Sequence, residues 1–497
     1  MKVPSHNGGY HRMRTVKKGL VPFWDESLID RQYSDVTLSA NQAEKEEVVM
    51  VCDLPWEGNS SNYYSIINDD GLYRMYYNGW SFLDPTYKEG MSVCYAESRD
   101  GIHWEKPDLG LCEFRGSTHN NIIMRRIPDN FTAMKDENPA EPPERRYKAL
   151  LQYSDVTGFK STFPETEGKS LVCMTSADGI RFEKYCVVSR GYTYDSMNTL
   201  HWNPHTNRYY CYFRRLHKRP EDPTSNLNET DVREIAVTES EDLLHWSEPK
   251  PLSFEGGEDY PLYTNCISAY PYDTRYYVGF PTRYVERKSW TPNFDRLSGA
   301  DARRERMRGN PRYGLAITDC VFMSSCDNLH FHRFDEACIT PGPETGLNWV
   351  YGDCYPAVGG VIETPARLAG DPPVLSLYMT RNRWMNKNME LVRYSFRRDG
   401  FASVKADYKG KTLRTIPFTF EGDSLALNFR TSARGGMVLS ILDEGGEPIP
   451  GYTTCELFGD STERPIDFDA PLSALQGKVV RFSFFMRDAE LFALRFS

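Results

Sequence analysis

Ser98-Arg99-Asp100-Gly101-Ile102-His103-Trp104 (SRDGIHW) belongs to a short pattern that recurs along the chain and decides its fold. The aspartate side chain can accept hydrogen bonds from the backbone that follows it, and the glycine can take the left-handed backbone conformation that a tight turn requires. The serine ends one strand, and the alternating aliphatic and aromatic residues Ile102 and Trp104 are typical of the start of another. The segment therefore predicts a tight turn between two antiparallel strands.

Three further copies keep the serine, the aspartate and the final aromatic residue, and they lie at 176–182 (SADGIRF), 240–246 (SEDLLHW) and 325–331 (SCDNLHF). A degenerate fifth copy, RRDGF, lies at 397–401. Successive aspartates of the five copies are 78, 64, 85 and 72 residues apart. Self-similarity at a roughly fixed period indicates a repeat architecture. Five hairpin-bearing units of unequal length predict an all-β fold with a five-bladed β-propeller.

The repeat divides the chain into three parts. We expect residues 1–40 to form an N-terminal segment whose strand near Val36 closes the ring. Residues 41–408 should form the propeller, which carries the catalytic site. After about residue 408 the turn pattern stops and alternating strands follow, so 409–497 should form a β-sandwich accessory domain.

The composition excludes several classes of function. The 497-residue chain has a net charge of -10 that is spread out rather than blocked, which argues against a nucleic-acid partner. No stretch approaches the roughly 20 apolar residues of a membrane helix, so we expect no membrane partner. The first 18 residues are polar and basic and lack the apolar core of a signal peptide, although a signal removed earlier would leave the same beginning.

The cysteines and histidines give no sign of a disulfide framework or a metal site. The twelve cysteines are scattered singly, and the ten histidines show no metal-binding spacing. These features predict a reduced, cytoplasmic protein that uses no metal and no other cofactor.

Acidic residues recur where each predicted blade begins. The first strand of a propeller blade lines the central channel, so polar residues at these positions converge. Cleavage of a glycosidic bond needs two carboxyl groups about 5 to 9.5 Å apart, and crowding of acids raises the pKa of at least one. We predict that Glu57, Asp136 and Asp195 face one pocket as the acid, base or nucleophile group, with Asp353 in reserve. The alternative is that each acid caps a turn or ties neighbouring strands.

Aromatic, amide and cationic residues at the same openings are candidates for substrate binding. Aromatic rings can stack on sugar rings, and amides can bond sugar hydroxyls. The candidate substrate-binding residues are Trp56, Asn198, Tyr263, Asn265, Arg283, Trp349 and Tyr351. The arginine-rich run 303–308 could gather a phosphate, sulfate or carboxylate, or it could be a solvated helix face.

Several longer stretches resemble known proteins. They are 55–58 (PWEG), 95–110 (YAESRDGIHWEKPDLG), 120–123 (NNII), 142–150 (PPERRYKAL), 262–265 (LYTN), 279–284 (GFPTRY), 348–353 (NWVYGD) and 376–378 (SLY). Through them the chain, from about residue 20 onward, resembles a group of bacterial glycosidase-like proteins. Its architecture is similar to that of the five-bladed-propeller glycosidases, which are the invertase-like (family 32), arabinanase-like (family 43) and mannoside-phosphorylase-like (family 130) enzymes. The resemblance implies a carbohydrate substrate.

The leading functional prediction is a glycoside hydrolase that acts on a small or terminal glycoside. Two alternatives stay open: a glycoside phosphorylase that uses inorganic phosphate, and a non-catalytic carbohydrate-binding propeller. Product release from a panel of glycosides, with and without phosphate, distinguishes the three.

Overall fold

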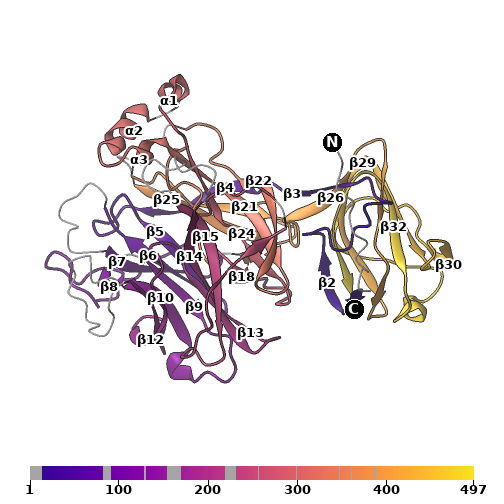
Figure 1. Ribbon diagram of the computed structural model, residues 1–497, viewed down its shortest axis with the longest axis horizontal. Coiled ribbons are helices and arrows are strands. Elements are labelled where there is room, and N and C mark those ends of the chain that lie inside the picture. Colours follow the sequence, from indigo (N-terminus) through magenta and orange to yellow (C-terminus); the bar gives the residue numbers. More distant parts are fainter. Residues whose placement is uncertain are drawn as a thin grey trace. The chain divides into compact units, whose positions relative to one another are not determined.

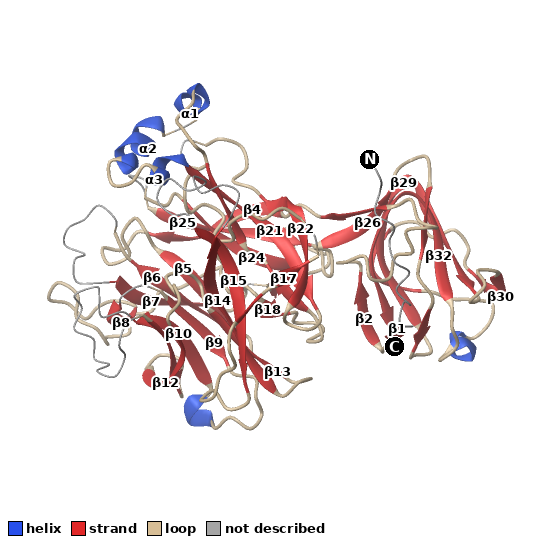
Figure 2. Cartoon of the chain, viewed as in Figure 1, coloured by secondary structure: helices blue, strands red, loops and turns tan. Residues whose placement is uncertain are grey.

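The computed structural model of the chain describes residues 14–81, 91–127, 130–153, 169–218, 231–255, 257–297, 299–345, 348–359, 361–384 and 388–497. The chain forms two units (Figure 1). One comprises Gln42–Phe396, and the other combines Met1–Asn41 with Arg397–Ser497. Strands dominate both units (Figure 2). Within the described ranges, none of the helices has the length and apolar character that crossing a membrane requires.

The unit Gln42–Phe396 is a five-bladed β-propeller, as the repeated turn predicts. Blade I contains β5 (Asn62–Asp69), β6 (Leu72–Gly79), β7 (Met91–Ser98) and β8 (Ile122–Ile127). Blade II contains β9 (Phe131–Lys135), β10 (Tyr147–Tyr153), β11 (Ser170–Ser176) and β12 (Glu183–Arg190). Blade III contains β13 (Thr199–Asn203), β14 (Arg208–Lys218), β15 (Asp231–Ser240) and β16 (Lys250–Pro251).

The two remaining blades are less regular. Blade IV contains β18 (Ser268–Ala269), β19 (Tyr277–Gly279), β20 (Thr282–Glu286), β21 (Ala316–Ser325), β22 (His330–Ile339) and β17 (Ser253–Phe254). Three short helices lie between β20 and β21, and they are α1 (Pro292–Arg296), α2 (Ala300–Met307) and α3 (Arg312–Leu315) (Figure 1). Blade V contains β23 (Ile362–Thr364), β24 (Val374–Arg381), β25 (Met389–Phe396) and β4 (Glu44–Cys52).

The recurring turn has the same structure in its four full copies, and each copy directly follows the third strand of blades I to IV. Asp100 Oδ1 accepts hydrogen bonds from the N–H groups of Ile102 and His103, both at 2.8 Å. The other three copies repeat this pair of bonds at 2.8 to 3.0 Å. The residue after each aspartate has a positive φ, even where it is Leu243 (φ 66°). The four turns therefore occupy equivalent positions, as predicted.

The same turn also ties neighbouring blades together. In three places the carbonyl oxygen of the positive-φ residue accepts a hydrogen bond from a buried tyrosine on the second strand of the preceding blade. These bonds run from Tyr378 to Gly101 at 2.7 Å, from Tyr76 to Gly179 at 2.8 Å and from Tyr212 to Asn328 at 3.1 Å. The turn thus recurs because it both closes a hairpin and holds the ring of blades.

The prediction that the strand near Val36 closes the ring is wrong. That strand, β3 (Thr37–Ala40), pairs with β26 (Ala402–Ala406) in the second unit. The ring is closed instead by β4, which pairs with β25 of blade V. The first residues of β4 are charged because they face polar partners: Glu47 pairs with Arg393 at 2.9 Å. Because these residues are charged, the strand lacks the alternating hydrophobic pattern by which a strand is predicted from sequence.

The second unit combines both ends of the chain. Its strands are β1 (Arg14–Val16), β2 (Gly19–Pro22), β3, β26, β27 (Lys411–Arg414), β28 (Phe418–Phe420), β29 (Leu425–Leu442), β30 (Pro448–Thr453), β31 (Asp460–Pro465) and β32 (Arg481–Phe496). The long strand β32 pairs with β2, β26, β27 and β29, around buried aromatic residues such as Phe482 and Phe496. The N-terminal strands therefore belong to this unit rather than to a separate segment. A β-sandwich arrangement of the unit stays a prediction.

Candidate active site at one end of the channel

The strand order places two kinds of connection at opposite ends of the propeller. Successive strands of a blade are antiparallel, so the chain enters each first strand at the end where the second strand finishes. We call this the leading end; the recurring turns lie at the opposite end. Residues that precede a first strand, or that finish a second strand, belong to the leading end.

Side chains from four blades meet at the leading end in what we call the arginine–tyrosine cluster. Its members are Tyr63 of blade I, Arg214 and Arg233 of blade III, Tyr263 and Tyr284 of blade IV, and Tyr351, Tyr355 and Arg383 of blade V. The Arg214 guanidinium lies 4.9 Å from the Tyr263 ring centre, and the Tyr351 hydroxyl donates a hydrogen bond to the Tyr263 hydroxyl at 2.9 Å. Arg383 lies 5.1 Å from the Tyr351 ring centre. The cluster is thus one connected set.

Arg383 is the most unusual member of the cluster. It is only 3% exposed, and its Nε and Nη1 atoms make no hydrogen bond within the described part of the chain. Its stem packs on Gly352, where a Cβ would lie 2.2 Å from Arg383 Cδ. A buried cation without a paired carboxylate is costly unless something else supplies the counter-charge. Arg383 is therefore suited to meet a negatively charged ligand or a charge that develops during a reaction.

Asp195 is the predicted acid that the structure places beside this cluster. Its side chain is 43% exposed, and Oδ1 lies 2.8 Å from Arg214 Nη2. The Tyr63 hydroxyl donates a hydrogen bond to the Asp195 backbone oxygen at 3.0 Å. Blades I and III therefore fix this residue, and Arg214 supplies its counter-charge.

Glu57 is held in a network of its own. It is fully buried, and its carboxylate lies 2.9 Å from Lys106 Nζ. It also accepts hydrogen bonds from the Tyr77 hydroxyl at 2.5 Å and from the Leu54 N–H at 2.9 Å. These contacts support the alternative in which this acid ties neighbouring segments together.

Asp136 lies at the opposite end of the propeller. It follows the first strand of blade II, β9, rather than preceding it. Its Oδ2 lies 3.0 Å from Lys148 Nζ, with both side chains 1% exposed, and it accepts a hydrogen bond from the Tyr209 hydroxyl at 3.0 Å. The structure thus does not bring Glu57, Asp136 and Asp195 together. The sequence reading failed here because β9 lies inside a stretch rich in polar residues and proline.

Asp353 is buried beside blade V. Its Oδ2 accepts a hydrogen bond from the Val350 N–H at 3.2 Å, whereas its buried Oδ1 has no hydrogen-bond partner in the described residues. Burial raises the pKa of Asp353 to about 7, against the opposing effect of the nearby charges of Arg306 and Arg303. Its partners differ from those of Asp195.

Asparagines stand at the starts of the first strands of four blades, namely Asn62, Asn130, Asn198 and Asn265. All four are buried. Asn198 Nδ2 donates to the backbone oxygens of Tyr194 and Ser196 at 3.0 and 3.1 Å. Asn265 Nδ2 likewise donates to the Met197 oxygen at 2.9 Å. The side-chain amides of Asn198 and Asn265, which were predicted to bind sugar, therefore donate to backbone oxygens. Amides, rather than acids, lie at the starts of these four strands.

The other predicted binding residues are divided between structural and open positions. Trp56 Nε1 donates to Asn121 Oδ1 at 2.7 Å. Arg283 forms a two-pronged ion pair with Asp319, at 2.9 and 2.6 Å, so its charge is already balanced. Tyr263 and Tyr351 belong to the arginine–tyrosine cluster, and Trp349 lines a separate pocket described below.

The arginine-rich run is neither an open anion site nor a fully solvated helix face. Arg303 and Arg306 are 1% and 4% exposed, and both donate to backbone oxygens of blade V. The arginines that sequence reasoning missed are Arg214 in β14, Arg233 in β15 and Arg383, which follows β24. An arginine inside or directly after a predicted strand was the signal that could have identified them, because charged residues are rarely buried unless they are paired.

Comparisons with known proteins give few matches in sequence and more in structure. No family model matches the chain. A segment of 64 residues is 39% identical to an uncharacterised protein of Mycobacterium tuberculosis, but it covers only 12% of this chain and 21% of that protein.

Solved structures similar to the chain include glycoside hydrolases of the kinds that the sequence resembles. The Bombyx mori family 32 beta-fructofuranosidase is 11% identical, with 94% of each chain covered and a TM-score of 0.35. The Penicillium chrysogenum alpha-L-arabinanase, complexed with arabinobiose, is 11% identical over 72% of this chain and 98% of its own, with a TM-score of 0.35. An N-acetylgalactosamine deacetylase from F. plautii, in complex with blood group B trisaccharide, is 13% identical over 72% and 96%, with a TM-score of 0.44. At such values these proteins assign no activity to the chain.

Proposed function

We propose that this chain is a carbohydrate-active enzyme that cleaves the glycosidic bond of a small or terminal glycoside at the leading end of the propeller. The observation that supports this most directly is Asp195, a half-exposed carboxylate that Arg214 fixes beside a cluster of tyrosines. Tyrosine rings present apolar faces for a sugar ring, and their hydroxyls can bond its polar groups.

The proposed roles follow from the charges. Asp195, held with its counter-charge at 2.8 Å, acts as the nucleophile that attacks the sugar carbon as the glycosidic bond breaks, or as the base that takes a proton from the attacking water. Arg383, buried without a carboxylate partner in the described residues, stabilises negative charge that develops on the leaving group. The tyrosines of the cluster, which are buried against one another, hold Arg214 and Arg383 in position.

A second candidate function, phosphorolysis, is favoured by the type of residue around Asp195. Hydrolysis of a glycoside ordinarily uses two carboxyl groups, whereas a phosphorylase receives its nucleophile as the phosphate ion. Asp195 contacts Arg214 and Tyr63, and the cluster beside it consists of arginines and tyrosines. Guanidinium groups are well suited to bind phosphate. A glycoside phosphorylase that uses inorganic phosphate therefore fits the same site.

The test is product release from a panel of fructosides, arabinosides, mannosides and galactosides, with and without inorganic phosphate. A hydrolase releases free sugar under both conditions, whereas a phosphorylase requires phosphate and yields a sugar phosphate. Asp195→Asn should lower turnover by about 10² to 10⁴. Asp301→Asn is the matched control, because that side chain is fully exposed on α2.

Two outcomes would overturn the proposal. Saturable binding of a glycoside without product under either condition would make the chain a carbohydrate-binding propeller. Turnover by Asp195→Asn at the wild-type rate would show that this carboxylate takes no part in the reaction.

A further inference from the structure

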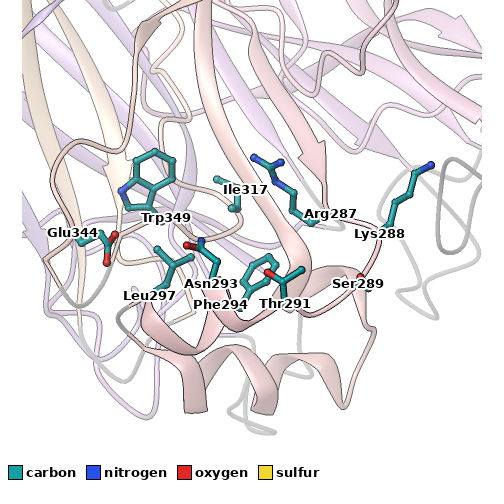
Figure 3. Close-up of a pocket in the computed structure, with 10 residues that line it drawn as sticks. All are labelled: Arg287, Lys288, Ser289, Thr291, Asn293, Phe294, Leu297, Ile317, Glu344 and Trp349. Atoms are coloured by element: carbon teal, nitrogen blue, oxygen red, sulfur yellow. The ribbon is translucent and has the colours of Figure 1, made fainter.

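A pocket of about 510 Å³ lies between α1 and the segment that precedes blade V (Figure 3). Its apolar side is formed by Phe294, Leu297 and Ile317, and Trp349 lies across from α1. The volume falls within the range of about 300 to 1,000 Å³ that is usual for small-molecule sites. None of the residues that line it belongs to the arginine–tyrosine cluster. The pocket is therefore a separate place where a ligand could bind.

Trp349 is held in a strained backbone conformation at this pocket. Its φ is 62°, in the left-handed region that is unfavourable for a bulky residue. The buried Arg303 of α2 donates to the backbone oxygens of Asn348 and Trp349 and so holds this conformation. The indole Nε1–H donates to the Gly342 oxygen at 2.8 Å, which also fixes the ring. The half-buried indole also packs against the apolar cluster of Phe294, Leu297 and Leu315, so its ring is fixed in place beside the pocket.

Arg287 brings an unused positive charge to the pocket. Its side chain is exposed and makes no hydrogen bond or ion pair with the described residues. In Figure 3 its guanidinium points toward the side on which Ile317 and Trp349 lie, whereas Lys288 extends away from it. Among the described residues of the lining, Glu344 is the one carboxylate. Burial lowers the pKa of Arg303, and the nearby charge of Glu344 opposes this effect. Glu344 thus has a cation nearby, and Arg287 has no such partner.

We propose that this pocket is a carbohydrate subsite for an acidic sugar unit, in which Trp349 stacks on the ring and Arg287 pairs with its carboxylate. A flat aromatic surface matches the apolar face of a sugar, and a guanidinium matches a carboxylate by two parallel hydrogen bonds. Asn293, on the α1 wall of the pocket, is placed to bond the ring hydroxyls. The inference deepens the proposed function and rests on it for the claim that the ligand is a glycan.

The test is calorimetric binding of trigalacturonate and of its neutral methyl ester, which needs no turnover. Arg287→Gln should weaken trigalacturonate binding at least tenfold and leave the neutral ester unchanged. Trp349→Ala should weaken both ligands, and Trp349→Phe should restore part of the affinity. Arg296→Gln is the matched control, because it removes an exposed arginine of α1 that does not line the pocket.

Other outcomes would refute the proposed carbohydrate subsite without contradicting the proposed enzymatic function. Equal binding of trigalacturonate to Arg287→Gln and wild type would do so, as would loss of binding in Arg383→Gln instead. If sulfate displaces the ligand and Trp349→Ala has no effect, the pocket is an anion site rather than a sugar site. Turnover on a glycoside with no trigalacturonate binding refutes the subsite alone. Binding here with no turnover of the panel or of trigalacturonate refutes the enzyme alone.

Discussion

Replacing Asp353 should change how the stability of the propeller depends on pH. Burial raises the pKa of this carboxyl to about 7, whereas an aspartate in an unfolded chain titrates near pH 4. Between these values the folded state keeps a proton that the unfolded chain has released, so the free energy of unfolding falls as the pH rises. The stabilisation from Asp353 is complete below about pH 4 and is lost by about pH 7.

The size of the effect follows from the same pKa shift. A one-proton difference changes the free energy of unfolding by about 1.4 kcal/mol per pH unit, and the window covers about three units. The contribution is therefore about 4 kcal/mol. A unit of about 350 residues has an unfolding entropy of about 0.75 kcal/mol/K, so 4 kcal/mol corresponds to about 5 °C in Tm.

The assay compares thermal and urea unfolding of wild type and Asp353→Asn between pH 4 and pH 8. The variant side chain does not titrate, so its stability relative to wild type should rise by about 4 kcal/mol between pH 4 and pH 7. Asp371→Asn, which replaces an exposed acid of blade V, should follow wild type throughout. Parallel profiles for wild type and Asp353→Asn would refute the reasoning, because they would mean that Asp353 titrates alike in both states.

Three further predictions concern the framework. Asp136→Asn should lower the free energy of unfolding by about 3 kcal/mol in urea and leave turnover intact, because it breaks a buried ion pair far from the leading end; lost turnover with unchanged stability would contradict this. Gly101→Ala should destabilise the fold by about 2 kcal/mol and Gly110→Ala by about 1 kcal/mol, because both glycines have a positive φ. The loss is larger at Gly101 because a Cβ there would lie 2.8 Å from a tyrosine oxygen, whereas a Cβ at Gly110 meets nothing within 4 Å. Equal losses of stability in the two variants would show that this crowding is unimportant. A thiol reagent should label Cys326 and Cys455 first in the folded protein, because these are the two exposed cysteines among the twelve free thiols, and labelling of all twelve at one rate would disagree with the described burial.

The architecture was readable from the sequence because the information that specifies it is local. Within seven residues the pattern supplies a serine, a hydrogen-bonding aspartate, a positive-φ residue and an aromatic anchor. Asp100 meets its partners within three residues, so no distant contact is needed to recognise the turn. The hydrogen bond from Tyr378 to Gly101 joins blade V to blade I, and no local sequence pattern predicts it.

The parts that the sequence missed depend on distant partners. The closing strand β4 begins with charged residues whose partners, such as Arg393, lie in blade V. From its sequence position Asp136 was predicted to begin blade II. It follows β9 instead, so it lies at the other end of the blade. Fragments of sequence cannot distinguish an acid that opens a strand from one that follows it when the strand is short and polar on both sides.

Carboxylates alone do not define the candidate site. Chemistry at a channel depends on the balance of charge there, and four first strands begin with neutral amides rather than carboxylates. Arg214 then has Asp195 as its counter-charge, while Arg383 has none among the described residues. The chain as a whole carries a net charge of -10, so a locally positive leading end would set this region apart from the rest of the surface. An anionic sugar or phosphate would therefore be repelled by most of the protein and retained here, and its binding should weaken as salt screens the attraction.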